Sequence, residues 1–297
     1  MRELTDTELK SIAKTAEQAG IAAGKYIQSQ FDQHYNKEQK IGGDSLASQV
    51  VTEVDFKAQE IILKGLKASM ETYDFGLLAE EATDDDSRHQ KDYFWCIDPM
   101  DGTLPFTERR SGYAVSIALI SNEGDPYIGV VYIPDQEICY STIRGKGVSQ
   151  NDLSVTLDYS STHALDFYMD QSFQSEKYYE WVKSQVKSWA DERDLELVIH
   201  SSYGGVRNAI GVMLSSRGCY FKFPKVRKGC GSIWDYAATR LMCEECGIQV
   251  SNMSGKTLHL NGQGTTFMNE QGILYASDTE LSDFIMQLSS QLKNLVD

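Results

Sequence analysis

The 297-residue chain has no long apolar run, and no apolar segment follows its polar start, MRELTDTELK. A membrane-spanning helix needs about 20 mostly apolar residues, and a secretory signal needs an apolar core near the start of the chain. We therefore expect neither a membrane span nor a targeting segment. Hydrophobic residues still make up 41 % of the chain, which is enough to build a folded core rather than a disordered chain.

Positive charge is also scarce, because 28 Lys and Arg face 43 Asp and Glu, for a formal net charge of −15. Proteins that bind nucleic acid polymers usually have the opposite sign, since contacts to phosphates supply much of their affinity. An acidic protein can still bind a small phosphorylated molecule through a divalent cation, a helix N-terminus or a small basic patch. The composition therefore argues against a nucleic acid partner but allows a phosphorylated substrate.

Cysteines and histidines are few and scattered. Six cysteines spread over a long chain are typical of reduced thiols in the cytoplasm rather than of a disulfide framework. Cys243 and Cys246 form a C-x-x-C pair, but no second pair stands at zinc spacing, so helix packing is the favoured interpretation. The five histidines form no nucleophile–base motif and are His34, His89, His163, His200 and His259.

The hydrophobic pattern predicts two halves, 1–150 with α+β character and 151–297 with alternating strands and helices. In the first half, the pattern predicts a helix over 5–27, a loop over 35–48, a strand end at 50–51, a helix over 52–70, a charged surface loop over 82–91, and strands over 93–97, 114–120, 127–133 and 138–142. In the second half it predicts a strand over 195–200, a helix over 205–215, and a helix that begins near 232 and ends before 247.

The most informative segment is Asp98-Pro99-Met100-Asp101-Gly102-Thr103, which directly follows an apolar strand. Carboxylates that converge at a strand end can hold a metal ion, and backbone N–H groups at the start of the next helix can hold phosphate. An isolated D-x-x-D is more often a solvated turn. Here further acidic residues stand at the end of an apolar segment or in the first turn of a helix, namely Asp55, Glu80, Glu81 and Asp235.

These segments together resemble the inositol monophosphatase-like, magnesium-dependent and lithium-sensitive phosphatases, which include 3′(2′),5′-bisphosphate nucleotidases. The resemblance covers nearly the whole chain in order and rests on V-T-x-x-D at 51–55, the Glu pair at 80–81, D-P-x-D-G-T at 98–103 and W-D-x-A-A at 234–238. It implies a layered α-β-α-β-α sandwich of the inositol monophosphatase and fructose bisphosphatase type. It also implies a phosphoric monoester hydrolase, with a homodimer as a fair expectation.

The resemblance also implies roles for single residues. One magnesium ion would be held by Glu80, Asp98 and the carbonyl of Met100, and a second by Asp98, Asp101 and Asp235. A third, weaker ion near Glu80 is an open alternative. Asp55 and Thr103, together with Glu80, would activate the attacking water, and the backbone of Gly102 and Thr103 would bind the phosphate. Two bound cations offset the charge of a phosphate monoester and activate water without a covalent nucleophile.

Two positions depart from the family pattern. Ala79 stands where the family usually has glycine before the Glu pair. Lys228 stands seven residues before Asp235, where members selective for inositol phosphates tend to have glutamate. Lys228 belongs to a basic segment, residues 222–228, that includes Arg227 and predicts a site for a second phosphate. The alternatives are a solvated basic loop, or a similar patch at 109–110.

The predicted function is therefore metal-dependent hydrolysis of a small phosphate monoester, with a bisphosphate such as 3′-phosphoadenosine 5′-phosphate as the substrate. Inositol monophosphate is the alternative substrate. A metal-binding protein without turnover is a further alternative, and a structural cation site in an unrelated α/β protein is a weaker one. The sequence decides neither the physiological substrate, nor lithium sensitivity, nor metal stoichiometry.

Overall fold

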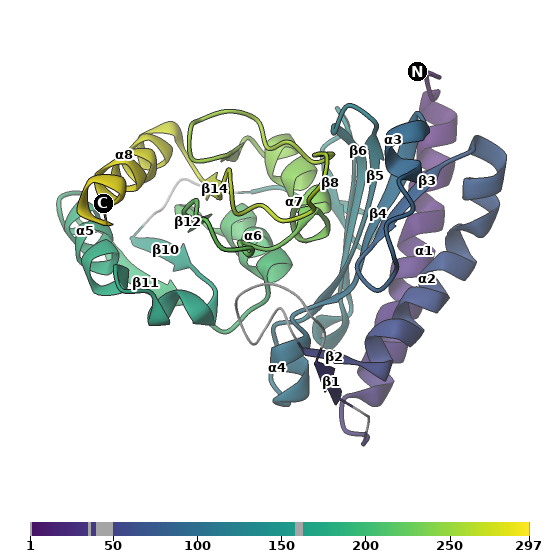
Figure 1. Ribbon diagram of the computed structural model, residues 1–297, viewed down its shortest axis with the longest axis horizontal. Helices are drawn as coiled ribbons and strands as arrows, with labels where there is room; N and C mark the ends of the chain where they lie inside the picture. Colours follow the sequence, from purple (N-terminus) through teal and green to yellow (C-terminus); the bar gives the residue numbers. More distant parts are fainter. Residues whose placement is uncertain (1, 35–36, 40–49, 158–162, 297) are drawn as a thin grey trace.

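The computed structural model describes residues 2–34, 37–39, 50–157 and 163–296. Helices and sheets alternate in five layers, which Figure 1 shows from one side. Helices α1 (Asp6–Gln30) and α2 (Glu53–Tyr73) cover the outer face of a seven-stranded sheet. Helices α6 (Gly205–Leu214) and α7 (Ile233–Glu245) lie between this sheet and a five-stranded sheet, whose far face is covered by α5 (Tyr179–Asp191) and α8 (Thr279–Val296).

The seven-stranded sheet follows chain order from β3 to β9, and only its first pair of strands is parallel. Short turns can join the antiparallel neighbours, whereas the parallel pair β3–β4 is connected by residues 80–92, which include a short helix. Its strands are β3 (Gly76–Ala79), β4 (Tyr93–Asp101), β5 (Ala114–Ser121), β6 (Pro126–Ile133), β7 (Ile138–Ile143), β8 (Val148–Gln150) and β9 (Leu153–Ser154).

The five-stranded sheet has the order β11-β10-β12-β14-β13, and β10 pairs in parallel with both of its neighbours. Its strands are β10 (Ala164–Tyr168), β11 (Glu196–His200), β12 (Gly218–Lys222), β13 (Gln249–Ser251) and β14 (Ile273–Ala276). Short remaining elements are β1 (Lys37–Gln39), β2 (Val50–Thr52), α3 (Ser87–Gln90), α4 (Thr103–Thr107) and the 3-10 turns η1 (Pro134–Gln136) and η2 (Gln171–Ser175).

Three apolar cores fill the spaces between the layers, and each uses alternate faces of the strands. On β4, for example, Trp95 and Ile97 point to the core under α1 and α2, whereas Phe94 and Cys96 point to the core around α6 and α7. A strand buried on both faces reads as one continuous apolar run. The run Tyr93–Ile97 therefore marks a strand at the centre of the molecule.

The predicted fold class, a layered α-β-α-β-α sandwich, is confirmed. Most predicted elements are present with ends shifted by a few residues, since local patterns mark ends poorly. Two loop predictions need correction. Within 35–48, Lys37–Gln39 is a strand that pairs with β2, and the other residues of that range lie outside those described. Within 82–91, α3 forms, and its Arg88 is buried.

Arg88 is buried because its guanidinium links two distant segments. It donates to Asp84 Oδ2 at 2.7 Å, and to Asn261 Oδ1 and the Gly262 carbonyl at 2.7 and 3.0 Å. A charged local sequence can thus face inward when partners from another segment satisfy it.

The last strand of the seven-stranded sheet ends at Ser154, and the first strand of the five-stranded sheet begins at Ala164. The division of the chain into two halves at residue 150 stays a prediction. Over the described residues, no helix is long and apolar enough to span a membrane.

Candidate active site

The site begins with an irregularity in β4. In the register with β5, Asp98 pairs with Ser116 and Asp101 with Ala114, so β4 holds one extra residue between them. In a regular strand, residues three apart point to opposite faces. A one-residue bulge reverses that alternation, and it brings Asp98 and Asp101 to the same side. Pro99, which cannot donate to the ladder, lies within this bulge, where proline is tolerated.

Asp235 reaches the same point from α7, the helix that packs directly against β4, β5 and β6. It is the third residue of α7, and its Oδ2 accepts a hydrogen bond of 2.9 Å from the backbone N–H of Ser232, the N-cap. One carboxylate oxygen from each of Asp98, Asp101 and Asp235 lies within 4.8 Å of the others. The structure therefore brings together three of the predicted metal ligands.

Glu80 joins this group through the parallel pair β3–β4. Ala79 pairs with Ile97, and the backbone N–H of Glu80 donates to the Ile97 carbonyl at 3.1 Å, so Glu80 lies beside Asp98. Burial, followed by the charge of Glu80, raises the pKa of Asp98 well above its usual range. The same two causes raise the pKa of Asp235 to about 6.

Asp98 is buried and Glu80, Asp101 and Asp235 are half-buried, and four acidic side chains so close together repel each other strongly unless a cation or a proton offsets the charge. Burial, then the charge of Asp235, also raises the pKa of Asp101 well above its usual range. Magnesium prefers oxygen ligands from carboxylates, and the carbonyl of Met100 lies on the same strand. The donors present therefore fit a divalent cation of this kind.

A second polar pair, Asp55 and Thr103, lies beside the carboxylates. Asp55 closes the capping box at the start of α2: its Oδ2 accepts from the N–H and hydroxyl of Thr52 at 2.8 and 2.6 Å. Its Oδ1 accepts from the Thr103 hydroxyl at 2.9 Å. Burial is the main reason why the pKa of Asp55 rises to about 6, against the lowering effect of these hydrogen bonds.

Glycines let the backbone come close to these side chains. Gly102 caps α4 with φ +85°, and a Cβ there would lie 2.6 Å from the Gly112 carbonyl. The N–H of Gly204 donates to that same carbonyl at 2.8 Å. A Cβ on Gly204 would lie 2.3 Å from Asp101 Oδ2. Glycine is therefore favoured at 102, which needs a left-handed backbone, and a Cβ at 204 would require the Asp101 side chain to shift.

The start of α6 is part of the site, which sequence reasoning missed. The backbone N–H groups of Gly205 and Val206 donate to the two oxygens of Asp101 at 3.1 and 2.8 Å. The free N–H groups of a helix start favour negative charge, so α6 fixes the Asp101 carboxylate. The pair Gly204-Gly205 at the start of a predicted helix was the visible signal.

The basic residues predicted to bind a second phosphate lie at the surface. Arg227 is exposed and forms an ion pair with Glu176. Lys228 is exposed, and its ammonium lies 5.8 Å from the centroid of the Phe267 ring. Phe267 bridges to Ser232, the N-cap of α7, so Lys228 lies near the start of the helix that carries Asp235.

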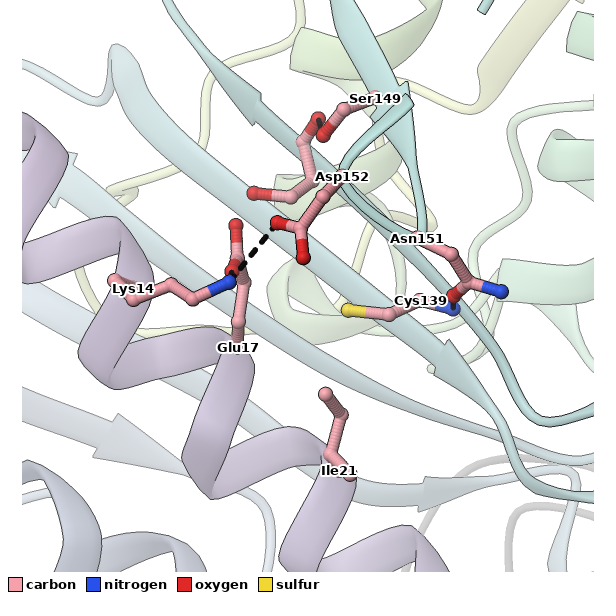
Figure 2. A pocket seen from close by; sticks show the side chains of 8 residues that line it. Lys14, Glu17, Ile21, Cys139, Ser149, Asn151 and Asp152 are labelled. Atoms are coloured by element: carbon pink, nitrogen blue, oxygen red, sulfur yellow. Dashed lines mark hydrogen bonds and ion pairs between the residues drawn. The ribbon is translucent and has the colours of Figure 1, made fainter. Parts of the chain in front are cut away.

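A separate hollow of about 150 Å³ lies between α1 and the strands β7 and β8, shown in Figure 2. The ion pair between Lys14 and Asp152, at 2.9 Å, crosses it. Cys139 lines it, and burial raises the pKa of this thiol to about 12. The residues that line the hollow include none of the carboxylates described above, so it is distinct from the candidate active site.

The fold and the buried carboxylates define a layered α/β protein with a group of oxygen donors suited to a metal ion. The model of the inositol monophosphatase family matches residues 8–294. The chain belongs to this family, and the sequence-based prediction of a phosphoric monoester hydrolase of the inositol monophosphatase type is confirmed.

Named relatives fall into two groups. The 3′(2′),5′-bisphosphate nucleotidase CysQ of Salmonella typhimurium is 26 % identical over 252 residues, 84 % of this chain and 92 % of that protein. An inositol-1-monophosphatase of Mesorhizobium japonicum is 33 % identical over 136 residues, and this match spans only 46 % of the chain and 48 % of that protein. Among solved structures, the IMPase of Thermotoga maritima has a TM-score of 0.73 at 18 % identity and covers 96 % of this chain and 98 % of its own.

Proposed function

We propose that the protein hydrolyses a phosphate monoester on a small molecule and that magnesium binds at Glu80, Asp98, the Met100 carbonyl, Asp101 and Asp235. The observation that carries this proposal is the convergence of four acidic side chains beside the hydrogen-bonded pair of Asp55 and Thr103. Magnesium held there would offset the charge of the phosphate and make a water molecule more acidic.

In this proposal Asp55 and Thr103 orient and deprotonate the attacking water. Asp55 is ionised at neutral pH, because its pKa is about 6. Its Oδ1 accepts a hydrogen bond from the Thr103 hydroxyl, so the lone pairs of Thr103 Oγ1 can accept a hydrogen bond from water. When the water gives its proton to Oγ1, the hydroxyl proton of Thr103 passes to Asp55. The same hydroxyl lies 3.1 Å from the Met100 carbonyl, which keeps it next to the carboxylate group. Glu80, which lies beside Asp98, serves as a further residue that positions the water.

The phosphate would bind at the start of α4, where Gly102 and Thr103 offer their backbone N–H groups. The left-handed conformation of Gly102 turns the chain sharply from β4 into α4. The proposed phosphate site would therefore follow Asp101 directly along the chain. Scissile phosphate, metal ligands and the Asp55–Thr103 pair would then share one small volume, as hydrolysis of a monoester requires.

For the substrate we propose a bisphosphate such as 3′-phosphoadenosine 5′-phosphate. The relative with the longer match is a bisphosphate nucleotidase, and Arg227 and Lys228 lie in a basic segment near the start of α7. Inositol monophosphate is the second candidate, which the match to an inositol-1-monophosphatase favours.

The test is phosphate release from inositol 1-phosphate, 3′-phosphoadenosine 5′-phosphate, fructose 1,6-bisphosphate and an aryl phosphate, with magnesium and with excess chelator. We expect chelator-sensitive release, fastest from a bisphosphate, and none from the folded Asp98→Asn variant. A preference for inositol 1-phosphate would keep the mechanism and refute the substrate. No release from any of the four by the folded protein would contradict the proposal for these substrate classes and favour a protein without turnover.

Two further predictions accompany this function. A cytoplasmic location is supported by six cysteines that are all free thiols. A homodimer is expected from the resemblance to the family, and sedimentation of the purified chain measures it directly.

A further inference from the structure

A half-buried ion pair lies at the edge of the five-stranded sheet that faces the carboxylates. Lys222 is the last residue of β12, and Asp170 follows the end of β10, its parallel neighbour. The carboxyl ends of parallel strands meet at one edge of a sheet. Lys222 Nζ lies 2.5 Å from Asp170 Oδ2, and the side chain of Lys222 is only 14 % exposed.

Asp170 is held in place by neighbours that leave it little freedom. Its Oδ1 accepts from the Tyr220 hydroxyl at 2.8 Å and from Asn208 Nδ2 at 3.3 Å. Asn208 is fully buried, and its Oδ1 has no hydrogen-bond partner among the described residues. This corner of the site therefore holds a fixed carboxylate, a paired ammonium and one unused acceptor.

Lys222 is also close to the metal-ligand group. Its ammonium lies 5.6 Å from the centroid of the Tyr236 ring and 5.7 Å from that of Tyr220. Tyr236 follows Asp235 on α7. Lys222 therefore lies close enough to Asp235 for their opposite charges to interact.

We propose that Lys222 is a specificity-determining residue that binds an anionic group on the leaving part of the substrate, such as a second phosphate. This inference rests on the proposed function. Attacking water and leaving group lie on opposite sides of a transferred phosphoryl group. In the proposed mechanism the attacking water binds at Asp55 and Thr103. The leaving group would then lie on the opposite side of the phosphoryl group, toward Asp101, Asp235 and Lys222.

The chemistry of the pair supports this assignment. An ammonium has three donors, and Asp170 occupies only part of them. A cation kept ionised and partly desolvated attracts a phosphate more strongly than an exposed one does. Arg227 and Lys228 are exposed and hence screened by solvent, so Lys222 would be the inner contact and these two the outer ones.

The experiment compares 3′-phosphoadenosine 5′-phosphate with adenosine 3′-monophosphate, which lacks only the second phosphate. We expect Lys222→Met to lower kcat/KM for the bisphosphate by about 10- to 100-fold, the range for a charge-assisted hydrogen bond, mainly through KM. The monophosphate should change less than about threefold. Lys222→Arg, which keeps the charge, should retain the preference. Lys256→Met, on an exposed lysine outside the site, is the matched control.

Each assay is run at saturating magnesium, and thermal melting confirms that each variant is folded. Lys222→Gln, which keeps a donor for Asp170 without the charge, replaces Lys222→Met if the latter does not fold. Equal losses on both substrates would overturn the inference, because Lys222 would then act only through the metal ligands. A loss confined to Lys228→Met would overturn it as well. If the wild-type protein releases phosphate from neither nucleotide, the proposed function fails for nucleotides, and the inference fails with it.

Discussion

Replacing Asp235 by asparagine should stabilise the folded protein in the absence of metal. The same substitution should abolish turnover in the presence of magnesium. The carboxylates of Asp98, Asp101 and Asp235 approach within 4.8 Å of one another, and Glu80 adds a further charge. Asparagine keeps an oxygen that can accept the hydrogen bond of 2.9 Å from the N–H of Ser232. The substitution therefore removes charge repulsion but retains the helix cap.

The magnitude follows from the raised pKa of Asp235. Burial and the charge of Glu80 raise it from 3.8 to about 6, which corresponds to at most about 3 kcal/mol. Because Asp235 is half-buried and water screens part of the repulsion, we expect about 2 kcal/mol. A carboxyl group with a raised pKa in the folded state destabilises that state as pH rises through about 6, and it has no such effect below about pH 4.

The assay is thermal melting in excess chelator at pH 7.5 and near pH 4. At pH 7.5, Asp235→Asn should raise Tm by about 4 °C, and the gain should vanish near pH 4. Added magnesium should raise the Tm of the wild type through binding to the folded state, but raise that of the variant much less. Turnover should fall at least about a hundredfold.

The control is Glu123→Gln, which removes an exposed charge and should leave Tm nearly unchanged. A lower Tm of Asp235→Asn at pH 7.5 without metal would refute the reasoning. The carboxylate would then be a favourable structural group and not part of a repulsive cluster.

Two further predictions concern the water side and the glycine contact. Thr103→Val should lower kcat at least about a hundredfold with little change in KM. The kcat of the wild type should fall as pH drops through about 6, because Asp55 that is already protonated cannot take up a proton through the Thr103 hydroxyl. A kcat that does not change between about pH 5 and 7.5 would contradict this role. Gly204→Ala should weaken magnesium binding in calorimetry, because the new Cβ would lie 2.3 Å from Asp101 Oδ2. The control Gly20→Ala, whose Cβ would have ordinary contacts of 3.6 Å, should bind magnesium like the wild type. Equal magnesium affinities of Gly204→Ala and the wild type would show that Asp101 can move aside.

Local sequence patterns were sufficient to predict the elements that carry Asp55, Asp98 and Asp235. The apolar run before Asp98 predicts a buried strand because a strand covered on both faces has no polar alternation. Asp55 and Asp235 lie in predicted first turns, where acidic residues favour the helix start. The structure places each as the third residue of its helix in a capping box. These features depend on contacts within a few residues, which a single sequence can reveal.

Other features depend on segments that are far apart in the chain. The buried position of Arg88 requires Asn261, which is 173 residues away, so its charged surroundings alone predicted an exposed loop. The ion pair between Lys222 and Asp170 requires β10 and β12 to be parallel neighbours, and nothing near Lys222 distinguishes it from the exposed Lys228.

The sequence by itself determined the kind of chemistry, because the types of side chain and their local spacing limit what can bind. Carboxylates after a buried strand favour a cation with oxygen ligands. Only the tertiary structure decided which groups meet. The bulge in β4 turned Asp98 and Asp101 to one side, and the start of α6 supplied two N–H groups to Asp101. Register and packing set these contacts, and both follow from the free energy of the whole fold rather than from a local pattern.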